Sequence, residues 1–187
     1  MRRILPLAIY CLAWLSGLLL AIPAQAEQRL GDFCRIKGQE ENILHGMGLV
    51  VGLKGTGDGD SKATMRALGR YMELMGHRLA TDKTGQTMLD ELKGAKNVAL
   101  VVVTSTVPAG GAQQGDMLDC TISAVGAKSL DGGYLLLTEL KGPLPTDKTV
   151  YGLARGMVSI DDSTKGPVAR VVRGCQLEAN FHNQFVK

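Results

Sequence analysis

The feature that most constrains the fold is the apolar run at residues 97–107, NVALVVVTSTV. Valine and threonine are branched at Cβ, which favours an extended strand over a helix. The run is apolar on both faces over most of its length and ends at Pro108, so it predicts a central strand that is buried on both sides. Such a strand needs hydrogen-bonded neighbours, and the chain must therefore form a sheet.

Five other segments predict further strands. Residues 42–53, NILHGMGLVVGL, carry Gly46, Gly48 and Gly52 at even spacing, so one face of this strand is flat and another backbone can approach it closely. Residues 118–124 alternate between apolar and polar side chains, as in a strand with one buried face. Strands are also predicted at residues 134–140 and 150–160, and a short one begins near Val168.

One amphipathic helix is predicted between the first strand and the central strand. Asp60 or Ser61 can cap its amino-terminal end, and Gly76 suits its carboxyl-terminal stop. Its apolar residues recur at intervals of three and four and share one face: Met65, Leu68, Met72, Met75 and Leu79. We interpret this stripe as a core face rather than a partner groove, because it is narrow and regular.

These elements together predict an α+β fold, in which one amphipathic helix packs against a mainly antiparallel sheet and Gly-rich loops join the elements. The loop Lys54–Asp60, KGTGDGD, lies between the first strand and the helix. Its glycines permit positive φ, and its aspartates can bond their own backbone.

Residues 1–26 have the three regions of a cleaved secretory signal peptide. Two arginines near the start precede an uncharged apolar stretch, and Ala24 and Ala26 are the small residues that signal peptidase requires. We therefore expect cleavage before Glu27 and export of the chain. Loss of two arginines and no acid lowers the formal net charge from +3 to +1, which is too small to indicate a nucleic-acid partner.

The exported chain keeps three cysteines, Cys34, Cys120 and Cys175. Export places them where disulfides persist, but three thiols form at most one internal bridge, and the sequence leaves the pairing open. Cys120 lies on the apolar face of a predicted strand, so we expect it to be buried. The cysteines are too widely spaced for a zinc site.

The Gly-rich loop does not satisfy the requirements of a phosphate-binding loop. Gly52 and Gly57 have the spacing of the two P-loop glycines, but Asp58 and Gly59 stand where a lysine and a hydroxyl residue are required. An acidic residue at the lysine position repels phosphate. A calcium-binding loop is also disfavoured, because Lys62 replaces an oxygen ligand.

The sequence lacks the Gly-x-Ser-x-Gly and His-Glu-x-x-His motifs of common hydrolases, and its three histidines are isolated. We therefore predict no catalysis, no cofactor and no metal. The alternative functions are an exported binding module and an exported hydrolase of unknown substrate, whose carboxylates come together from distant positions.

Four sequence blocks carry a family resemblance: NILHGMGLVVGLKGTGD from residue 42, KNVALVVVTSTVP from 96, GDMLDCTISAVGAKSLDGGYLLLTELKG at 115–142 and VYGLARG at 150–156. In this order and at this spacing they resemble the flagellar P-ring protein family. The blocks cover almost all of residues 38–156. One block alone is a weak signal, whereas four in order are specific.

The resemblance implies a structural protein of the bacterial flagellar basal body, located in the periplasm. Family members assemble as a homo-oligomeric ring around the rod, associate with peptidoglycan, and form with the L-ring protein a bushing in which the rod turns. The implied partners are thus other copies, rod proteins, the L-ring protein and peptidoglycan. The residues that we expect at contacts between copies are Gly46, Gly48, Gly52, Gly55, Gly57, Asp58 and Gly59; the glycines equally suit turns within one subunit.

The expected organisation is a signal peptide at 1–26, the family's amino-terminal α/β region at 27–160, and a short segment at 161–187 that forms an incomplete domain. Family members are usually longer, so a fragment and a functional short form both fit.

Residues after Gly174 offer no clear partner strand, and a ring needs two complementary surfaces per subunit. We therefore expect the chain to fold as far as Gly156, to fray after Gly174 and not to close a ring alone.

Overall fold

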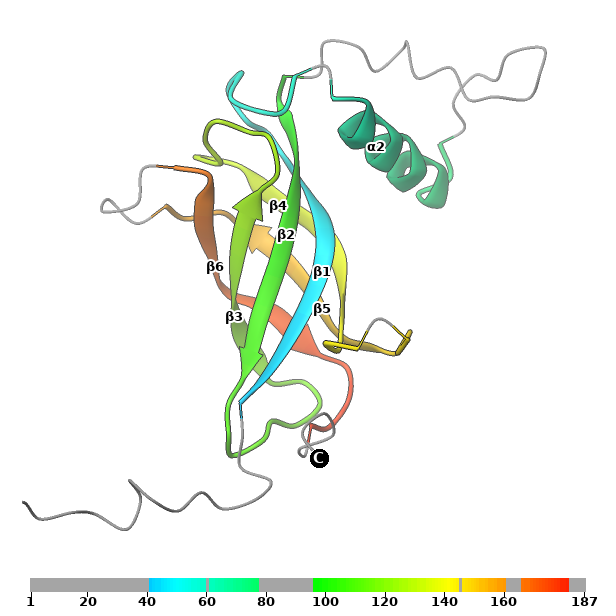
Figure 1. The fold of residues 1–187 in the computed structure, drawn as a ribbon, viewed down its shortest axis with the longest axis vertical. Helices are drawn as coiled ribbons and strands as arrows, with labels where there is room; N and C mark the ends of the chain where they lie inside the picture. The colour runs from blue at the N-terminus through cyan, green and yellow to red at the C-terminus, as the bar shows by residue number, and fades with distance from the viewer. Residues whose placement is uncertain (1–40, 60, 78–95, 145, 161–165, 182–187) are drawn as a thin grey trace, which may run out of the picture. The chain divides into compact units, whose positions relative to one another are not determined.

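The computed structural model describes residues 41–59, 61–77, 96–144, 146–160 and 166–181. These residues form six strands and one helix (Figure 1). The strands are β1 (Asn42–Val51), β2 (Val98–Val107), β3 (Met117–Ala124), β4 (Tyr134–Lys141), β5 (Val150–Met157) and β6 (Val168–Leu177), and the helix is α2 (Lys62–Leu74).

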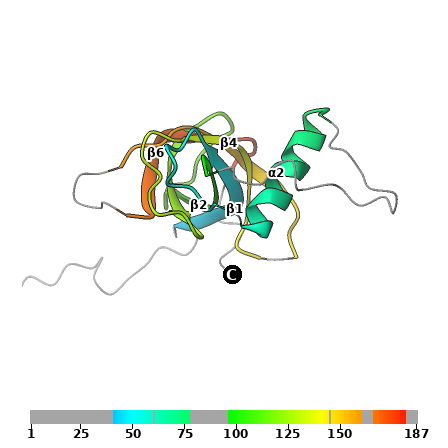
Figure 2. The same ribbon diagram turned by 90° about the horizontal axis from the view of Figure 1, so that it is seen from above.

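The six strands make a closed antiparallel barrel in the order β1-β2-β3-β6-β5-β4. Seen from above, the strands surround a common centre, and α2 lies outside them (Figure 2). The strand positions expected from the sequence are therefore confirmed in outline, including the strand that begins at Val168. Among the described residues, no helix has the length and apolar composition needed to cross a membrane.

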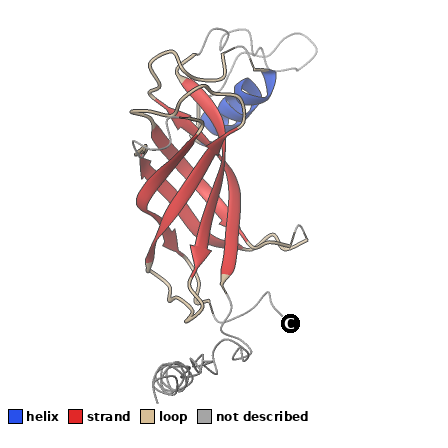
Figure 3. Cartoon of the chain, turned by 60° about the vertical axis from the view of Figure 1, so that its left-hand side comes forward, coloured by secondary structure: helices blue, strands red, loops and turns tan. Residues whose placement is uncertain are grey.

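The predicted α+β class is wrong. Six strands make up most of the regular structure in the described residues, and a single helix of 13 residues is described beside them (Figure 3). The sheet also has no open edge, because β1 pairs with β4 as well as β2, and β6 pairs with both β3 and β5. Period-2 alternation reports which face of a strand is buried, but it does not report whether the first and last strands of a sheet meet.

Close approach between β1 and β4 allows this closure. A Cβ atom at Gly46 would collide with the carbonyl oxygen of Glu139, and one at Gly48 would collide with the hydroxyl of Thr138. The register between β1 and β4 shifts between His45 and Val50, next to these glycines. Two of the three evenly spaced glycines, Gly46 and Gly48, therefore lie against β4 of the same chain, whereas Gly52 follows the end of β1 and is exposed.

The carboxyl-terminal segment completes the barrel instead of fraying. β6 continues past Gly174 to Leu177, which pairs with Gly152 of β5. Phe181 is fully buried, and its backbone exchanges hydrogen bonds with Ala112 at 2.8 and 3.2 Å. Residue 160 thus lies between two strands of one barrel, and the expectation that residues after Gly174 lack a partner strand is wrong, because β6 pairs with β3 and β5 as far as Leu177.

The barrel interior holds one continuous apolar core. Its largest fully buried side chains come from five strands and the closing loops, and β5 adds Tyr151 and Ala154: Leu44, Val101, Ile122, Leu130, Leu135, Leu140, Val171, Leu177 and Phe181. The ring of Phe181 packs against Tyr151 of β5, with 4.6 Å between ring centroids and a tilt of 58°. This contact closes the end of the barrel at which β6 finishes.

A second, smaller core lies outside the barrel under α2. Ala67, Leu68 and Tyr71 of the helix pack against Leu49 of β1 and a pair of β2 residues, Val98 and Leu100. The first four residues of β2 are consequently buried on both faces, whereas Val102, beyond the helix, is exposed. The central doubly buried strand predicted from the sequence is thus confirmed for its first half only.

The helix follows the predicted pattern only in part, since the core beneath it receives Leu68 of the predicted stripe together with Ala67 and Tyr71, but not Met72. Ser61 is its N-cap and accepts a long hydrogen bond of 3.5 Å from the amide of Thr64, and Gly76 adopts φ +86° just after its end. Met65 is buried, as expected, but Met75 is 70% exposed. Leu79 lies outside the described residues.

Closure at Gly46 leads to a stability prediction. Gly46→Ala adds a methyl group against the backbone of β4, so we expect it to lower the free energy of unfolding by about 1–3 kcal/mol. Gly110→Ala is the matched control, because a Cβ there meets nothing within 4 Å, and it should change stability by less than about 0.5 kcal/mol. Urea unfolding of both variants measures the difference. Equal stabilities would mean that β4 does not approach β1 this closely.

Candidate assembly surface

The loop after β1 binds the start of β2 through its backbone. The amide of Gly57 donates to the carbonyl of Lys96 at 2.9 Å, and the amide of Asp58 donates to that of Val98 at 3.0 Å. A Cβ at Gly57 would collide with the Val98 carbonyl, so only glycine fits this approach. The GTGD part of the loop therefore extends the contact between β1 and β2 beyond the end of the barrel.

Asp58 joins its loop to two elements, α2 and β2, through one carboxylate oxygen. Its Oδ2 accepts hydrogen bonds from the hydroxyl of Thr64 in α2, at 2.6 Å, and from the amide of Leu100 in β2, at 2.7 Å. Its Oδ1 is buried and lies near Gly126, where a Cβ would approach it to 3.3 Å. Asp58 thus fixes the first turn of α2 against β2.

Thr56 ties the same loop to the connection between β3 and β4. Its hydroxyl donates to the carbonyl of Ser129 at 2.8 Å, and its own carbonyl accepts from the amide of Lys128 at 2.9 Å. The loop therefore holds one end of the barrel together with both its side chains and its backbone.

The expected contact residues divide into two groups in the structure. Gly46, Gly48 and Gly57 lie against other parts of the same chain, and Asp58 is bound to α2 and β2. Gly55 and Gly59 have open space where a Cβ would be, both at positive φ, and Gly52 is exposed. Ala24, Ala26, Glu27 and Cys34 lie outside the described residues.

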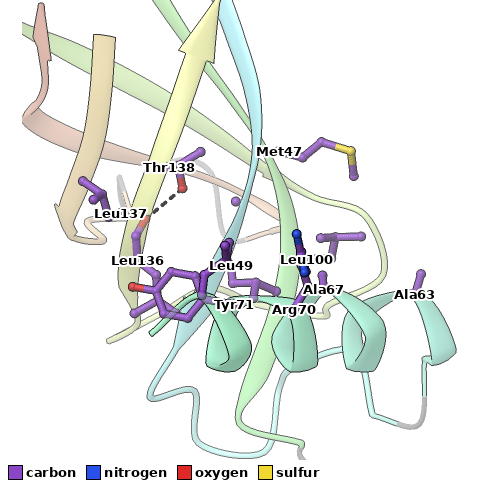
Figure 4. A pocket seen from close by; sticks show the side chains of 12 residues that line it. Met47, Leu49, Ala63, Ala67, Arg70, Tyr71, Leu100, Leu136, Leu137 and Thr138 are labelled. Atoms are coloured by element: carbon purple, nitrogen blue, oxygen red, sulfur yellow. Dashed lines mark hydrogen bonds between the residues drawn. The ribbon is translucent and has the colours of Figure 1, made fainter. Parts of the chain in front are cut away.

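A groove not anticipated from the sequence runs between α2 and the outer face of the barrel (Figure 4). It has a volume of about 440 Å³. Tyr71 and Leu74 of the helix form one wall, and the side chains of Met47, Leu136 and Leu137 come from β1 and β4 on the other side. The lining is mostly apolar, with Arg70 as its charged residue.

Exposed apolar residues continue from this groove over β1 and its neighbours. Met47 is 64% exposed and also lines a second hollow, of about 280 Å³, together with Val102 and Leu144. We call this surface the β1 face and define it by its exposed apolar residues: Ile43, Met47, Leu74, Val102, Leu137 and Leu144. Contiguous exposed apolar residues of this kind mark interaction sites in soluble proteins.

The loop beside the second hollow is held by a short hydrogen bond. The hydroxyl of Tyr151 donates to Oδ2 of Asp147 at 2.6 Å, and the amide of Thr149 donates to its Oδ1 at 2.9 Å. The bond from Tyr151 lowers the pKa of Asp147, and the same bond raises the pKa of Tyr151. Asp147 therefore remains ionised at the edge of the β1 face.

A second apolar surface lies on the opposite side of the barrel. β6 is three positions from β1 in the closed order, and it exposes Val168 and Val172; on the neighbouring strand β3, Met117, which pairs with Gln176, is exposed as well. We call these three residues the β6 face. Arg170 and Arg173 are also exposed on this strand. Arg173 adopts φ 49° at a bulge, where its amide donates to Asp119 at 2.7 Å.

The remaining predicted site residues are the two cysteines of the barrel. Cys120 is fully buried on the inner face of β3, as expected, and Cys175 is fully buried on β6. In the described part of the chain, no group of His, Cys, Asp and Glu side chains is arranged to hold a metal ion.

The structure thus defines a small closed β-barrel with exposed apolar residues on two opposite sides. The sequence model of the flagellar P-ring protein family matches residues 29–185. The chain belongs to the flagellar P-ring protein family, which confirms the resemblance seen in its four sequence blocks.

Individual relatives agree with this assignment. The flagellar P-ring protein of Helicobacter hepaticus is 36% identical over 91% of this chain and 47% of its own length. That of Nitrobacter winogradskyi is 39% identical over 97% of this chain and 45% of its own length, and that of Rhodopseudomonas palustris BisB5 is 41% identical over 87% and 41%. The chain therefore spans less than half the length of these relatives.

The contacts of Asp58 lead to a second prediction. Asp58→Ala removes two charge-assisted hydrogen bonds and leaves the Leu100 amide without its acceptor, so we expect a loss of about 2–3 kcal/mol in the free energy of unfolding. Asp131→Ala, at an exposed position, is the control and should stay within about 0.5 kcal/mol of the wild type. Chemical denaturation measures both, and an unaffected Asp58→Ala variant would contradict the bonding described here.

Proposed function

We propose that this chain is a structural subunit of the flagellar P ring, which surrounds the rod in the periplasm and acts as its bushing. Membership of the P-ring family supports the assignment to the basal body. The proposed partners are other copies of the chain, rod proteins, the L-ring protein and peptidoglycan. The proposed role is structural and does not involve catalysis.

The observation that carries the proposal is the pair of opposed apolar faces. Subunits of a closed ring make heterologous contacts, so each subunit needs two different surfaces that fit one another. The β1 face has a groove beside α2, and the β6 face has exposed apolar side chains on the far side of the closed barrel. The proposed occupant of the groove is therefore the β6 face of the next copy.

The position of the faces suits a ring better than a two-fold dimer. A two-fold dimer joins one patch to the same patch on its partner, which leaves the opposite apolar surface exposed. Contacts through opposite sides of each barrel cover both surfaces in every copy. Repetition of this contact closes a ring when the rotation between neighbouring copies is the right one.

An experiment that introduces opposite charges on the two faces tests the proposed contact. Met47→Glu places a carboxylate in the apolar interface, and we expect it to weaken self-association of the exported chain by about tenfold or more. Val172→Lys on the β6 face should restore association when combined with Met47→Glu, because the new charges attract one another across the contact. Light scattering across a concentration series measures association, and quantitation of the chain in purified basal bodies measures its incorporation.

Val125→Glu is the matched control, since Val125 is 62% exposed, close to the 64% of Met47, but belongs to neither face. This variant should associate and enter basal bodies as the wild type does. Normal association of Met47→Glu, or equal impairment of Val125→Glu, would contradict the contact between the two faces. Absence of the wild-type chain from basal bodies would contradict the proposed function itself.

A further inference from the structure

Two cysteine side chains meet inside the barrel, from strands that are far apart in the sequence. Cys120 of β3 and Cys175 of β6 are both fully buried among the core residues. The two strands are hydrogen-bonded neighbours: Leu118 pairs with Cys175 and Cys120 pairs with Val171, with a bulge between the two pairs. The two thiols are in hydrogen-bonding contact with each other.

The surroundings of the two thiols leave little free space. Ser105 of β2 pairs with Cys120, and its hydroxyl donates to the carbonyl of Asp119 at 3.0 Å. On the other side, a Cβ at Gly152 of β5 would lie 2.8 Å from Sγ of Cys175, so β5 approaches this sulfur closely. A bulky adduct on either sulfur therefore does not fit the closed barrel, whereas a direct bond between the sulfurs adds no atoms.

We propose that Cys120 and Cys175 form an intramolecular disulfide that cross-links β3 to β6 in the exported protein. The proposal rests on the proposed periplasmic location, because disulfides persist in that compartment. One Sγ–Sγ bond forms, and the two S–H bonds break. Two electrons and two protons pass to a disulfide-bearing oxidant, either a thiol oxidoreductase or glutathione disulfide, whose own S–S bond is reduced to two thiols.

The pKa values of the two thiols shift in opposite directions in the closed barrel. The hydrogen bond with Cys175, together with burial, raises the pKa of the Cys120 thiol. The same hydrogen bond lowers the pKa of the Cys175 thiol in the closed barrel. Since both sulfurs are inaccessible in the closed barrel, the exchange takes place before β6 has closed against β3 and β5.

The bond would secure the last strand of the barrel. Cys120 and Cys175 are separated in the chain by β4 and β5, so the cross-link closes a long loop and restricts the unfolded chain. It also acts at β6, whose pairing with β3 is interrupted by the bulge at Arg173. A disulfide at this point therefore adds a covalent link where the regular pairing of the two strands is interrupted.

Peptide mapping of the exported chain tests the bond directly. The protein is denatured with an alkylating reagent present and without reductant, and is then digested with trypsin. We expect the peptide that contains Cys120 to be linked to the peptide that begins at Gly174, with Cys34 alkylated. Alkylation of both Cys120 and Cys175, or a bridge from either of them to Cys34, would overturn the proposal.

Thermal unfolding provides a second readout. Reduction of the wild type should lower its Tm by on the order of 5–10 °C, while the Cys120→Ala/Cys175→Ala double variant should not respond to reductant. Cys34→Ala is the matched control and should keep the full response. A double variant that responds as the wild type does would assign the effect to another bond and overturn the proposal.

Refolding of purified reduced chain with glutathione disulfide separates this inference from the proposed function. Formation of the Cys120–Cys175 bond in this reaction supports the geometry even if the chain is absent from basal bodies. Stable glutathione adducts on Cys120 or Cys175, in place of the internal bond, would contradict the geometry even if the chain does assemble there.

Discussion

Closure of the barrel depends on the contact of β1 with β4 at Gly46 and Gly48. β1 already pairs with β2 along its full length, so its other edge must find a second partner or stay open. The two glycines leave no Cβ between the strands, and Glu139 and Thr138 come directly against the β1 backbone. A side chain there would push the strands apart and expose two edges to non-specific pairing. The interior core also follows from closure, because all six strands contribute to it only when the barrel is complete.

Local features of this fold were predictable from the sequence, whereas closure was not. Alternation and β-branched runs located the strands, and spacing by three and four located α2, since each pattern reflects only a strand or helix and the face it buries. Pairing of β1 with β4 and of β3 with β6 joins distant segments, and no local period encodes it. The end of β6 shows the same limit. The residues after Gly174 have no recognisable partner strand in the sequence, yet β6 continues to Leu177, and Phe181 beyond it is fully buried.

The candidate surface was only partly predictable for a related reason. Recurrent glycines indicate a close approach, but they do not distinguish contact within a subunit from contact between subunits. Gly46, Gly48 and Gly57 meet their own chain, while Gly55 and Gly59 have room beside them. The groove depends on where α2 docks against the barrel. From the sequence, every residue of the methionine stripe was expected to face the core. Met75, which follows the last helical residue Leu74, is exposed instead.

The partial cover that α2 provides explains why the apolar surface exists at all. The helix buries the outer face of the first half of β2 and of Leu49, but Val102 and Met47 lie beyond it. The stability of a single subunit does not require these exposed side chains to be apolar, whereas contact with a partner does. A closed barrel also presents such a face with little change of backbone on binding, so less ordering entropy opposes the contact. Its strand order then places the second apolar face on the far side, where the next copy in a ring would meet it.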